Sequence, residues 1–192
     1  MKKLPLFMMA LLGVAPSAFA DWTLLNDQSS LHYVSIKSTD IAEINSFNKL
    51  SGTVTDQGVV SFDVHLASVD TGVAIRDERM QEMFFEVTQF AQASVSGDVD
   101  LARVTALGVG ETYSDTIQLQ LSLHGVTQDV SSHVQVTKLN AGKVLLTSLE
   151  PVILNAAHYK LAQGVEALRE IAGLPAVSPL VPVTYSLVFQ QD

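Results

Sequence analysis

Cysteine is absent from this sequence, and charge is scarce in it. Charged residues make up 16% of the 192 residues and aromatic residues 7%, and acidic side chains outnumber basic ones by 20 to 11. Without cysteine the chain can form no disulfide and can carry no lipid on an N-terminal cysteine. A net charge of −9 opposes general binding to nucleic acid or to an anionic membrane, because both recruit basic surfaces. The fold must therefore rest on an apolar core.

The first twenty residues have the features of a secretory signal peptide. Two lysines precede an apolar stretch at residues 4–14, and an A-x-A cleavage site occupies residues 18–20. The apolar stretch is shorter than the about 20 residues that a membrane-spanning helix needs. We therefore expect cleavage after Ala20 and a mature chain that starts at Asp21 and is unanchored in the periplasm.

Cleavage would leave about 170 residues, enough for one domain that buries about 70% of the surface of its unfolded chain. It would remove two lysines and no acidic residue, which takes the formal net charge from −9 to −11. The sequence shows no internal repeat or domain linker. We expect a signal peptide over residues 1–20 and one domain over residues 21–192. The sequence leaves a homodimer possible.

Residues 171–191 contain no charged side chain and are long enough to suggest a transmembrane helix. Pro175, Pro179 and Pro182 oppose that interpretation, because each removes a backbone donor and clashes with the preceding turn. Apolar residues occupy every second position over 181–189, which is typical of a strand with one buried face. We expect a loop and then a strand, with no integral membrane segment in the mature chain.

The same alternation recurs along the chain and indicates antiparallel strands buried on one face. The clearest strand covers residues 116–123. The apolar or inward sets of the other strands are His32, Val34 and Ile36, then Val60, Phe62, Val64 and Leu66, then Ala93, Val95, Gly97 and Val99, then Val134 and Val136, and then Val144 and Leu146. Turns are expected at residues 56–58 and 140–142.

Two segments have helical periodicity instead. Residues 75–87 carry an apolar stripe at positions i, i+3, i+4 and i+7 of one helix face. The stripe consists of Met80, Met83, Phe84 and Val87. A second helix is expected from about residue 161 to residue 172, where Gly173 and Pro175 supply a stop.

About eight strands and two short helices must protect their sheet edges, and closure into a barrel does so most completely. A barrel of about eight strands can either fill with side chains or hold one small ligand. We therefore predict an all-β fold, an antiparallel β-barrel with two short α-helices. The alternation by itself also permits a sandwich.

Two stretches of the sequence carry specific motifs. The first comprises Ala67-Ser68-Val69-Asp70-Thr71-Gly72, Arg76-Asp77-Glu78-Arg79-Met80 and Phe84-Phe85, and the second is Leu121-Ser122-Leu123-His124-Gly125-Val126-Thr127. They resemble the central signature and the strand-to-turn motif of the YceI-like family of bacterial proteins, in that family's order and spacing. With weaker matches at Val34-Ser35-Ile36-Lys37 and around Phe47, the resemblance covers nearly all of the mature chain.

The resemblance implies a lipocalin-like barrel whose elongated apolar cavity holds a polyisoprenoid, an isoprenoid quinone or a fatty-acid-like lipid, without a cofactor. Burial gains about 0.8 kcal/mol per CH₂, so such a ligand needs no charged anchor. The residues expected to contact it are Val34, Ile36, Phe47, Phe62, Val64, Met80, Met83, Phe84, Leu119, Leu121, Val136, Leu146, Tyr185 and Leu187. The same side chains could instead fill the core. Arg76 and Asp77 could orient a ligand head group or fix the loop before the helix.

The chain departs from the family pattern at two places. Phe90-Ala91 stands where an aromatic-proline pair usually follows the helix. Residues 155–159 stand where the family often has an Asp-Phe-Gly-like motif near the last strands. The second departure puts the shape of the barrel mouth in doubt, and with it the ligand.

Catalytic motifs are missing from the sequence. It has no G-x-S-x-G elbow, no H-E-x-x-H, no phosphate-binding glycine loop and no cysteine nucleophile. Its five histidines lie on different segments without close pairwise spacing, so we expect no metal site. They are His32, His65, His124, His133 and His158. A binding protein is therefore favoured over an enzyme, with no catalytic residues. An enzyme acting on a sequestered lipid and an envelope stress-related interaction module are the alternatives.

Overall fold

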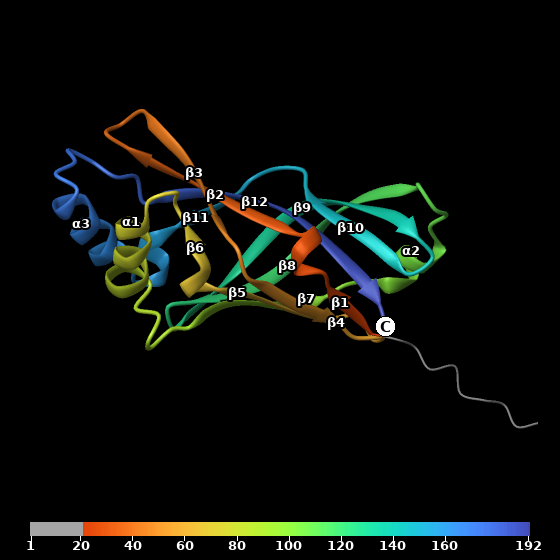
Figure 1. The fold of residues 1–192 in the computed structure, drawn as a ribbon. Helices are drawn as coiled ribbons and strands as arrows, with labels where there is room; N and C mark the ends of the chain where they lie inside the picture. The colour runs from red at the N-terminus through yellow and green to blue at the C-terminus, as the bar shows by residue number, and fades with distance from the viewer. Residues whose placement is uncertain (1–20) are drawn as a thin grey trace, which may run out of the picture.

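The computed structural model describes residues 21–192, so the expected signal peptide lies outside the described residues. Figure 1 shows strands wrapped around one long axis, with short helices at the two ends. The strands are β1 (Trp22–Leu24), β2 (Ser30–Lys37), β3 (Ile41–Phe47), β4 (Leu50–Val54), β5 (Val59–His65), β6 (Val69–Asp70), β7 (Gln92–Asp98), β8 (Thr112–Leu123), β9 (Val126–Asn140), β10 (Lys143–Ser148), β11 (Val152–Asn155) and β12 (Leu180–Gln191). The helices are α1 (Ala74–Arg79), α2 (Leu101–Ala106) and α3 (Ala162–Ile171), with the short turns η1 (Asn26–Gln28), η2 (Leu66–Ser68), η3 (Met80–Phe84) and η4 (Ala156–Tyr159).

Eight of the strands close into an antiparallel barrel. Their order is β1-β4-β5-β7-β8-β9-β10-β12, and β12 pairs back onto β1, with Trp22 opposite Gln191 and Leu24 opposite Phe189. Closure pairs the strand edges around this ring, except along residues 112–118 of β8, which pair with β9 alone. Protected edges are the physical advantage that the sequence analysis anticipated. The predicted all-β antiparallel barrel is confirmed.

The barrel is extended at one end by β2, β3 and β6. β2 pairs with β12, β3 with β2, and β6 with the last residues of β3. The helices α1 and α3 lie at this end, whereas α2 lies at the opposite end (Figure 1). Residues 176–178 hold the β2–β3 hairpin in place through two backbone hydrogen bonds. The Ser38 amide donates to the Ala176 carbonyl over 2.9 Å, and the Ser178 amide donates to the Ile36 carbonyl over 2.8 Å.

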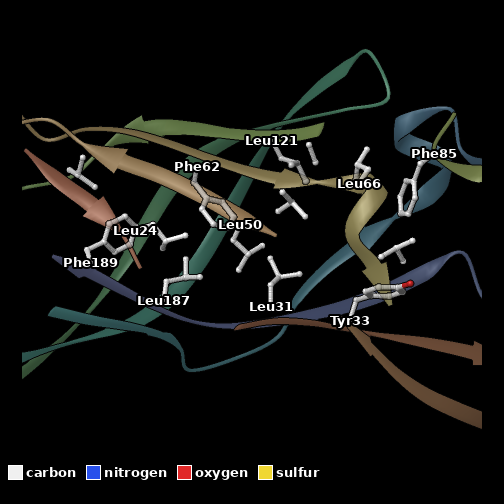
Figure 2. Close-up of a cluster of buried hydrophobic side chains, with 14 of the residues drawn as sticks. Leu24, Leu31, Tyr33, Leu50, Phe62, Leu66, Phe85, Leu121, Leu187 and Phe189 are labelled. Carbon is white, nitrogen blue, oxygen red and sulfur yellow. The ribbon is translucent and has the colours of Figure 1, made fainter. Parts of the chain in front are cut away.

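Alternation along each strand separates an apolar interior from a polar exterior. Figure 2 shows buried side chains that converge between the strands, with Phe189 and Leu24 towards one end and Tyr33 and Phe85 towards the other. On the outside of β8 and β9, polar side chains pair across the strands. Gln118 donates to Ser131 over 3.1 Å, for example. These cross-strand pairs fix which face of the sheet turns inward.

Most of the predicted elements are present. The two expected turns join β4 to β5 and β9 to β10, and α3 falls within the predicted helix 161–172. Residues 172–179 contain no helix, and β12 follows them as a strand. Within residues 21–192, no helix has both the length and the apolar character needed to cross a membrane.

The predicted helix over residues 75–87 ends three residues early, at Phe84, and its last turn is not α-helical. α1 continues into η3, a π-helical turn in which the Phe85 amide donates to the Met80 carbonyl over 2.8 Å. A π-turn holds an extra residue, so it rotates the following side chains away from the α-helical stripe. Met83 therefore points outward and is 39% exposed. Val87 lies beyond the helix and packs against the core.

The helix α2 was not predicted. Asp100 caps it, since its carboxylate accepts the Ala102 amide over 2.9 Å. Val104 is buried, while Leu101 and Leu107 pack against the core. Asp100 followed by apolar residues at 101, 104 and 107 is a capped helical pattern that could have revealed this helix.

Candidate functional site

The barrel encloses a cavity of about 810 Å³. This volume lies within the range of about 300–1,000 Å³ typical of small-molecule sites. Inward-facing residues of the barrel strands form its wall, and α1, η3, α3 and α2 contribute residues at its ends. Because the period-two alternation places an apolar side chain on nearly every inward position, the wall is predominantly apolar.

Most of the residues expected to contact a ligand line this cavity. They are Phe47, Phe62, Val64, Met80, Phe84, Leu119, Leu121, Val136, Leu146, Tyr185 and Leu187. Strands from all parts of the chain bring them together, and η3 adds Met80 and Phe84 at one end. Their contact with a ligand stays a prediction.

Three of the expected residues do not line the cavity. Val34 and Ile36 occupy the outward positions of β2, where Val34 lies opposite Ile44 of β3. Both faces of this strand carry apolar residues, so the alternation could not tell which face turns inward. The π-turn η3 turns the Met83 side chain away from the cavity.

The inward positions of β2 are occupied by Tyr33, Ser35 and Lys37, which the sequence analysis did not select. Tyr33 is 8% exposed, and its ring centre lies 5.4 Å from that of Phe47. Ser35 accepts a hydrogen bond from the buried Asn45 amide over 3.1 Å. The polar residues of β2 could have been recognised as an inward set only from the pairing of β2 with β3.

A cluster of charged side chains lies at the end of the cavity near α1, which we call the mouth. Lys37 Nζ and Arg76 Nη1 each lie 2.7 Å from a different oxygen of Glu43. Arg76 also donates to the Thr71 carbonyl over 2.5 Å. The hydrogen bond from Lys37, together with the charge of Arg76, lowers the pKa of Glu43 below its ordinary value. These bonds tie β2 and β3 to the start of α1.

Two buried polar atoms at the mouth have no hydrogen-bond partner within residues 21–192. They are the Tyr33 hydroxyl oxygen and Arg76 Nε. Leaving such a group unpaired costs about 1–3 kcal/mol, so each is an available contact for a polar atom of a bound molecule. Burial raises the pKa of Tyr33 well above its ordinary value, which keeps the phenol neutral and able to donate.

Asp77 and Arg76 have different surroundings. The Asp77 carboxylate accepts the Thr71 amide over 2.8 Å and the Thr71 hydroxyl over 2.5 Å, and it does not line the cavity. These two bonds fix the loop before α1. Arg76 does line the cavity, and its bond to Thr71 fixes the same loop.

Deeper in the cavity, the Tyr185 hydroxyl and the Ser132 hydroxyl form a hydrogen bond of 2.7 Å across the barrel wall. Burial raises the pKa of Tyr185, while the bond to Ser132 opposes this shift. The pair satisfies both hydroxyls, so it adds little polarity to the interior.

Two of the histidines lie beside carboxylates. His124 contacts Glu86 over 2.7 Å, and His133 lies 3.4 Å from Glu150. Over the described part of the chain, no three His, Asp or Glu side chains gather in a group that could hold a metal ion.

The fold and the cavity together define a class of protein, the closed antiparallel barrels that enclose an apolar cavity. The model of the YceI-like domain matches residues 22–189. The chain therefore belongs to the YceI-like family, as the two sequence motifs indicated.

Solved structures provide further comparisons. A polyisoprenoid binding domain from Saccharophagus degradans, implicated in plant cell wall breakdown, is 34% identical, with a TM-score of 0.87 over 89% of this chain and 98% of that chain. Burkholderia cenocepacia BcnA shares the fold at 18% identity, with a TM-score of 0.65 over 86% of this chain and 98% of that chain. No curated protein sequence matches this chain.

Proposed function

We propose that this protein is an exported, periplasmic binding protein that sequesters or carries a long-chain lipid inside the barrel. The candidate ligands are a polyisoprenoid, an isoprenoid quinone and a fatty-acid-like molecule. The observation that carries the proposal is the long apolar cavity of about 810 Å³, which has charged and hydrogen-bonding groups at its mouth. The similarity to a polyisoprenoid binding domain supports it.

The cavity wall supplies the binding energy in this proposal. Each CH₂ transferred from water to the wall contributes about 0.8 kcal/mol, so a long chain binds tightly without any bond to its tail. Met80 has a flexible, polarizable side chain that adapts to chains of imprecise shape. The apolar residues from the barrel strands, with Met80 and Phe84, are the proposed tail contacts.

The head group of the ligand is proposed to lie at the mouth. There the Tyr33 hydroxyl and Arg76 Nε are unpaired within residues 21–192, and both face the same end of the cavity. A head group with an oxygen acceptor would pair with both atoms and remove the cost of leaving them unsatisfied. Lys37 and Glu43 would hold Arg76 in position.

We propose a binding role and not catalysis. Among the described residues, the Thr71 hydroxyl at the cavity lies beside the Asp77 carboxylate, but Asp77 also accepts the Thr71 amide, and the two bonds fix the loop before α1. The Ser132 hydroxyl contacts a tyrosine, and the charged groups at the mouth pair with one another. Such pairs position a ligand but do not activate an attacking atom.

Extraction of the native protein tests the proposal. The full chain is produced in bacteria, purified from the periplasmic fraction without detergent, and extracted with organic solvent for mass spectrometry. We expect a polypeptide that starts at Asp21 and a stoichiometric isoprenoid or long-chain acyl molecule. Arg76→Gln should lower retention about tenfold or more, which corresponds to about 1.4 kcal/mol.

Lys49→Gln is the control, because it removes one positive charge from an exposed side chain that does not line the cavity. It should retain the wild-type amount of ligand. An empty extract, combined with failure to bind added quinone or fatty acid, would contradict the proposed function.

A further inference from the structure

The cavity reaches the protein surface at a second place, remote from the mouth. Its lining includes Asp98 at the end of β7 and both Thr116 and Gln118 of β8, all of which are exposed to solvent. Gln118 belongs to the outer face of the barrel, since its side chain bonds to Ser131 there. Backbone atoms of an outward residue can also line a cavity, but two outward residues of β8 beside the end of β7 indicate that the wall is interrupted here.

The sheet pairing explains the interruption. β7 and β8 pair from Ser94 opposite Ser122 to Gly97 opposite Leu119, and no further. Beyond that point β7 ends, whereas residues 112–118 of β8 continue and pair with β9 alone. The wall is therefore split between the two strands, and we call this split the slot.

The helix α2 lies beside the slot and covers it only in part. It follows β7 directly, and Val104 turns inward and is 6% exposed. Arg103 forms an ion pair with Asp115 of β8, and its guanidinium carbon lies 4.2 Å from the centre of the Tyr113 ring. These contacts hold α2 against β8, yet exposed residues still line the cavity on either side of the slot.

The two openings differ in charge. Asp98, Asp100 and Asp115 line the cavity at the slot, where Arg103 is already paired with Asp115. Lys138 is buried against the Trp22 ring and does not line the cavity. At the mouth, Lys37 and Arg76 face the cavity together with Glu43. An anionic or oxygen-rich head group is repelled by the carboxylates at the slot and attracted by the cations at the mouth.

We propose that the cavity is a tunnel with two openings, and that a long-chain ligand lies in it in one direction, with its head group at the mouth and the end of its tail at the slot. This inference rests on the proposed function. It extends that function, because a tunnel does not set an upper limit on chain length as a closed pocket does. Chains longer than the barrel are accepted, and their ends emerge beside α2.

Paramagnetic labelling tests this arrangement, and the cysteine-free sequence allows a single label. A nitroxide is attached at Gln118→Cys beside the slot or, in a second protein, at Ile75→Cys, which lines the mouth and is 52% exposed. Each delipidated protein is loaded with docosanoic acid carrying ¹³C at either its terminal methyl or its carboxyl carbon. Decanoic acid, labelled at the methyl, is the short control.

We expect the label at residue 118 to broaden the docosanoic methyl signal severalfold more than the carboxyl signal, and the label at residue 75 to do the reverse. The label at residue 118 should not broaden the signal of the decanoic methyl carbon, because a short chain held at the mouth does not reach the slot. Thr116→Cys provides a second slot label if Gln118→Cys does not fold.

If the label at residue 118 broadens the carboxyl signal as strongly as the methyl signal, the proposal that the ligand lies in one direction would be overturned. If neither slot label broadens the signal of the docosanoic methyl carbon, the proposal of a second opening would be overturned. In both cases the proposed function stands, since the acid is bound. Failure of the unlabelled chain to bind either acid would instead contradict the proposed function itself.

Discussion

Phe84 and Met83 are neighbours in the chain but have different surroundings. Phe84 lines the cavity and its ring centre lies 4.7 Å from that of Phe85, whereas Met83 faces outward. Phe84→Glu should therefore reduce lipid retention at least tenfold, because it places a carboxylate in an apolar wall. Met83→Glu should keep the wild-type amount. Extracted lipid is measured by mass spectrometry, and circular dichroism verifies folding. Equal retention by the two variants would show that η3 does not contact the ligand.

Tyr33 couples the stability of the protein to alkaline pH. The pKa of Tyr33 is raised by burial, so an unfolded chain loses this proton near pH 10 while the folded chain keeps it. The contribution of Tyr33 is complete below pH 10, and stability falls above it by about 1.4 kcal/mol per pH unit. Tyr33→Phe should remove this loss, as measured by urea unfolding at neutral and strongly alkaline pH.

The same variant should cost little at neutral pH, because the Tyr33 hydroxyl has no partner within residues 21–192. Tyr113→Phe is the control. The pKa of Tyr113 is also raised by burial, but this ring is only half-buried, so its substitution should change the alkaline loss less. An undiminished alkaline loss in Tyr33→Phe would refute the assignment.

At the scale of elements, the contact between α3 and η3 depends on a glycine. A β-carbon on Gly164 would lie 2.9 Å from Phe84 Cδ2 and 3.1 Å from Phe84 Cα. Gly164→Val should push the two elements apart at the cavity end and lower the free energy of unfolding by about 1–3 kcal/mol. Release of bound lipid should become faster, because Phe84 forms part of the wall.

Gln163→Val is the control for Gly164→Val, since it adds the same β-branched side chain to an exposed position of α3. Thermal unfolding and the rate of fluorescent fatty-acid release are compared for the two variants. Helix propensity alone would make Gly164→Val slightly more stable, because glycine is a poorer helix former than valine. An unchanged or raised stability of Gly164→Val would therefore contradict the contact with Phe84.

The sequence predicted elements well where periodicity was strong and local. The strand over residues 116–123 lies within β8, and α3 lies within the predicted helix. The sequence did not predict local structure correctly where contacts with other elements decide which face of a helix or strand turns inward. The π-turn at Met80–Phe84 leaves no periodic signal, and the inward face of β2 was reversed because both faces of the strand carry apolar residues. Only the pairing of β2 with β3 and β12 resolves that choice.

At the scale of the whole molecule, closure brings together the two ends of the described residues 21–192. Trp22 pairs with Gln191, and the Asp192 amide donates to the Asp21 carbonyl over 3.0 Å. The barrel thus depends on contacts between residues that are far apart in sequence. The same is true of the mouth, where Arg76 meets Glu43.

The sequence by itself indicated the class of fold, the family and eleven of the residues that line the cavity, because alternation and two short motifs are local properties of the chain. It also determined that no disulfide holds the barrel, since cysteine is absent. The tertiary structure alone decided which face of β2 turns inward, which polar atoms gather at the mouth, and where the wall is split between β7 and β8. Each of these depends on the register between strands, and register is set by side chains that the chain brings together only when the barrel closes.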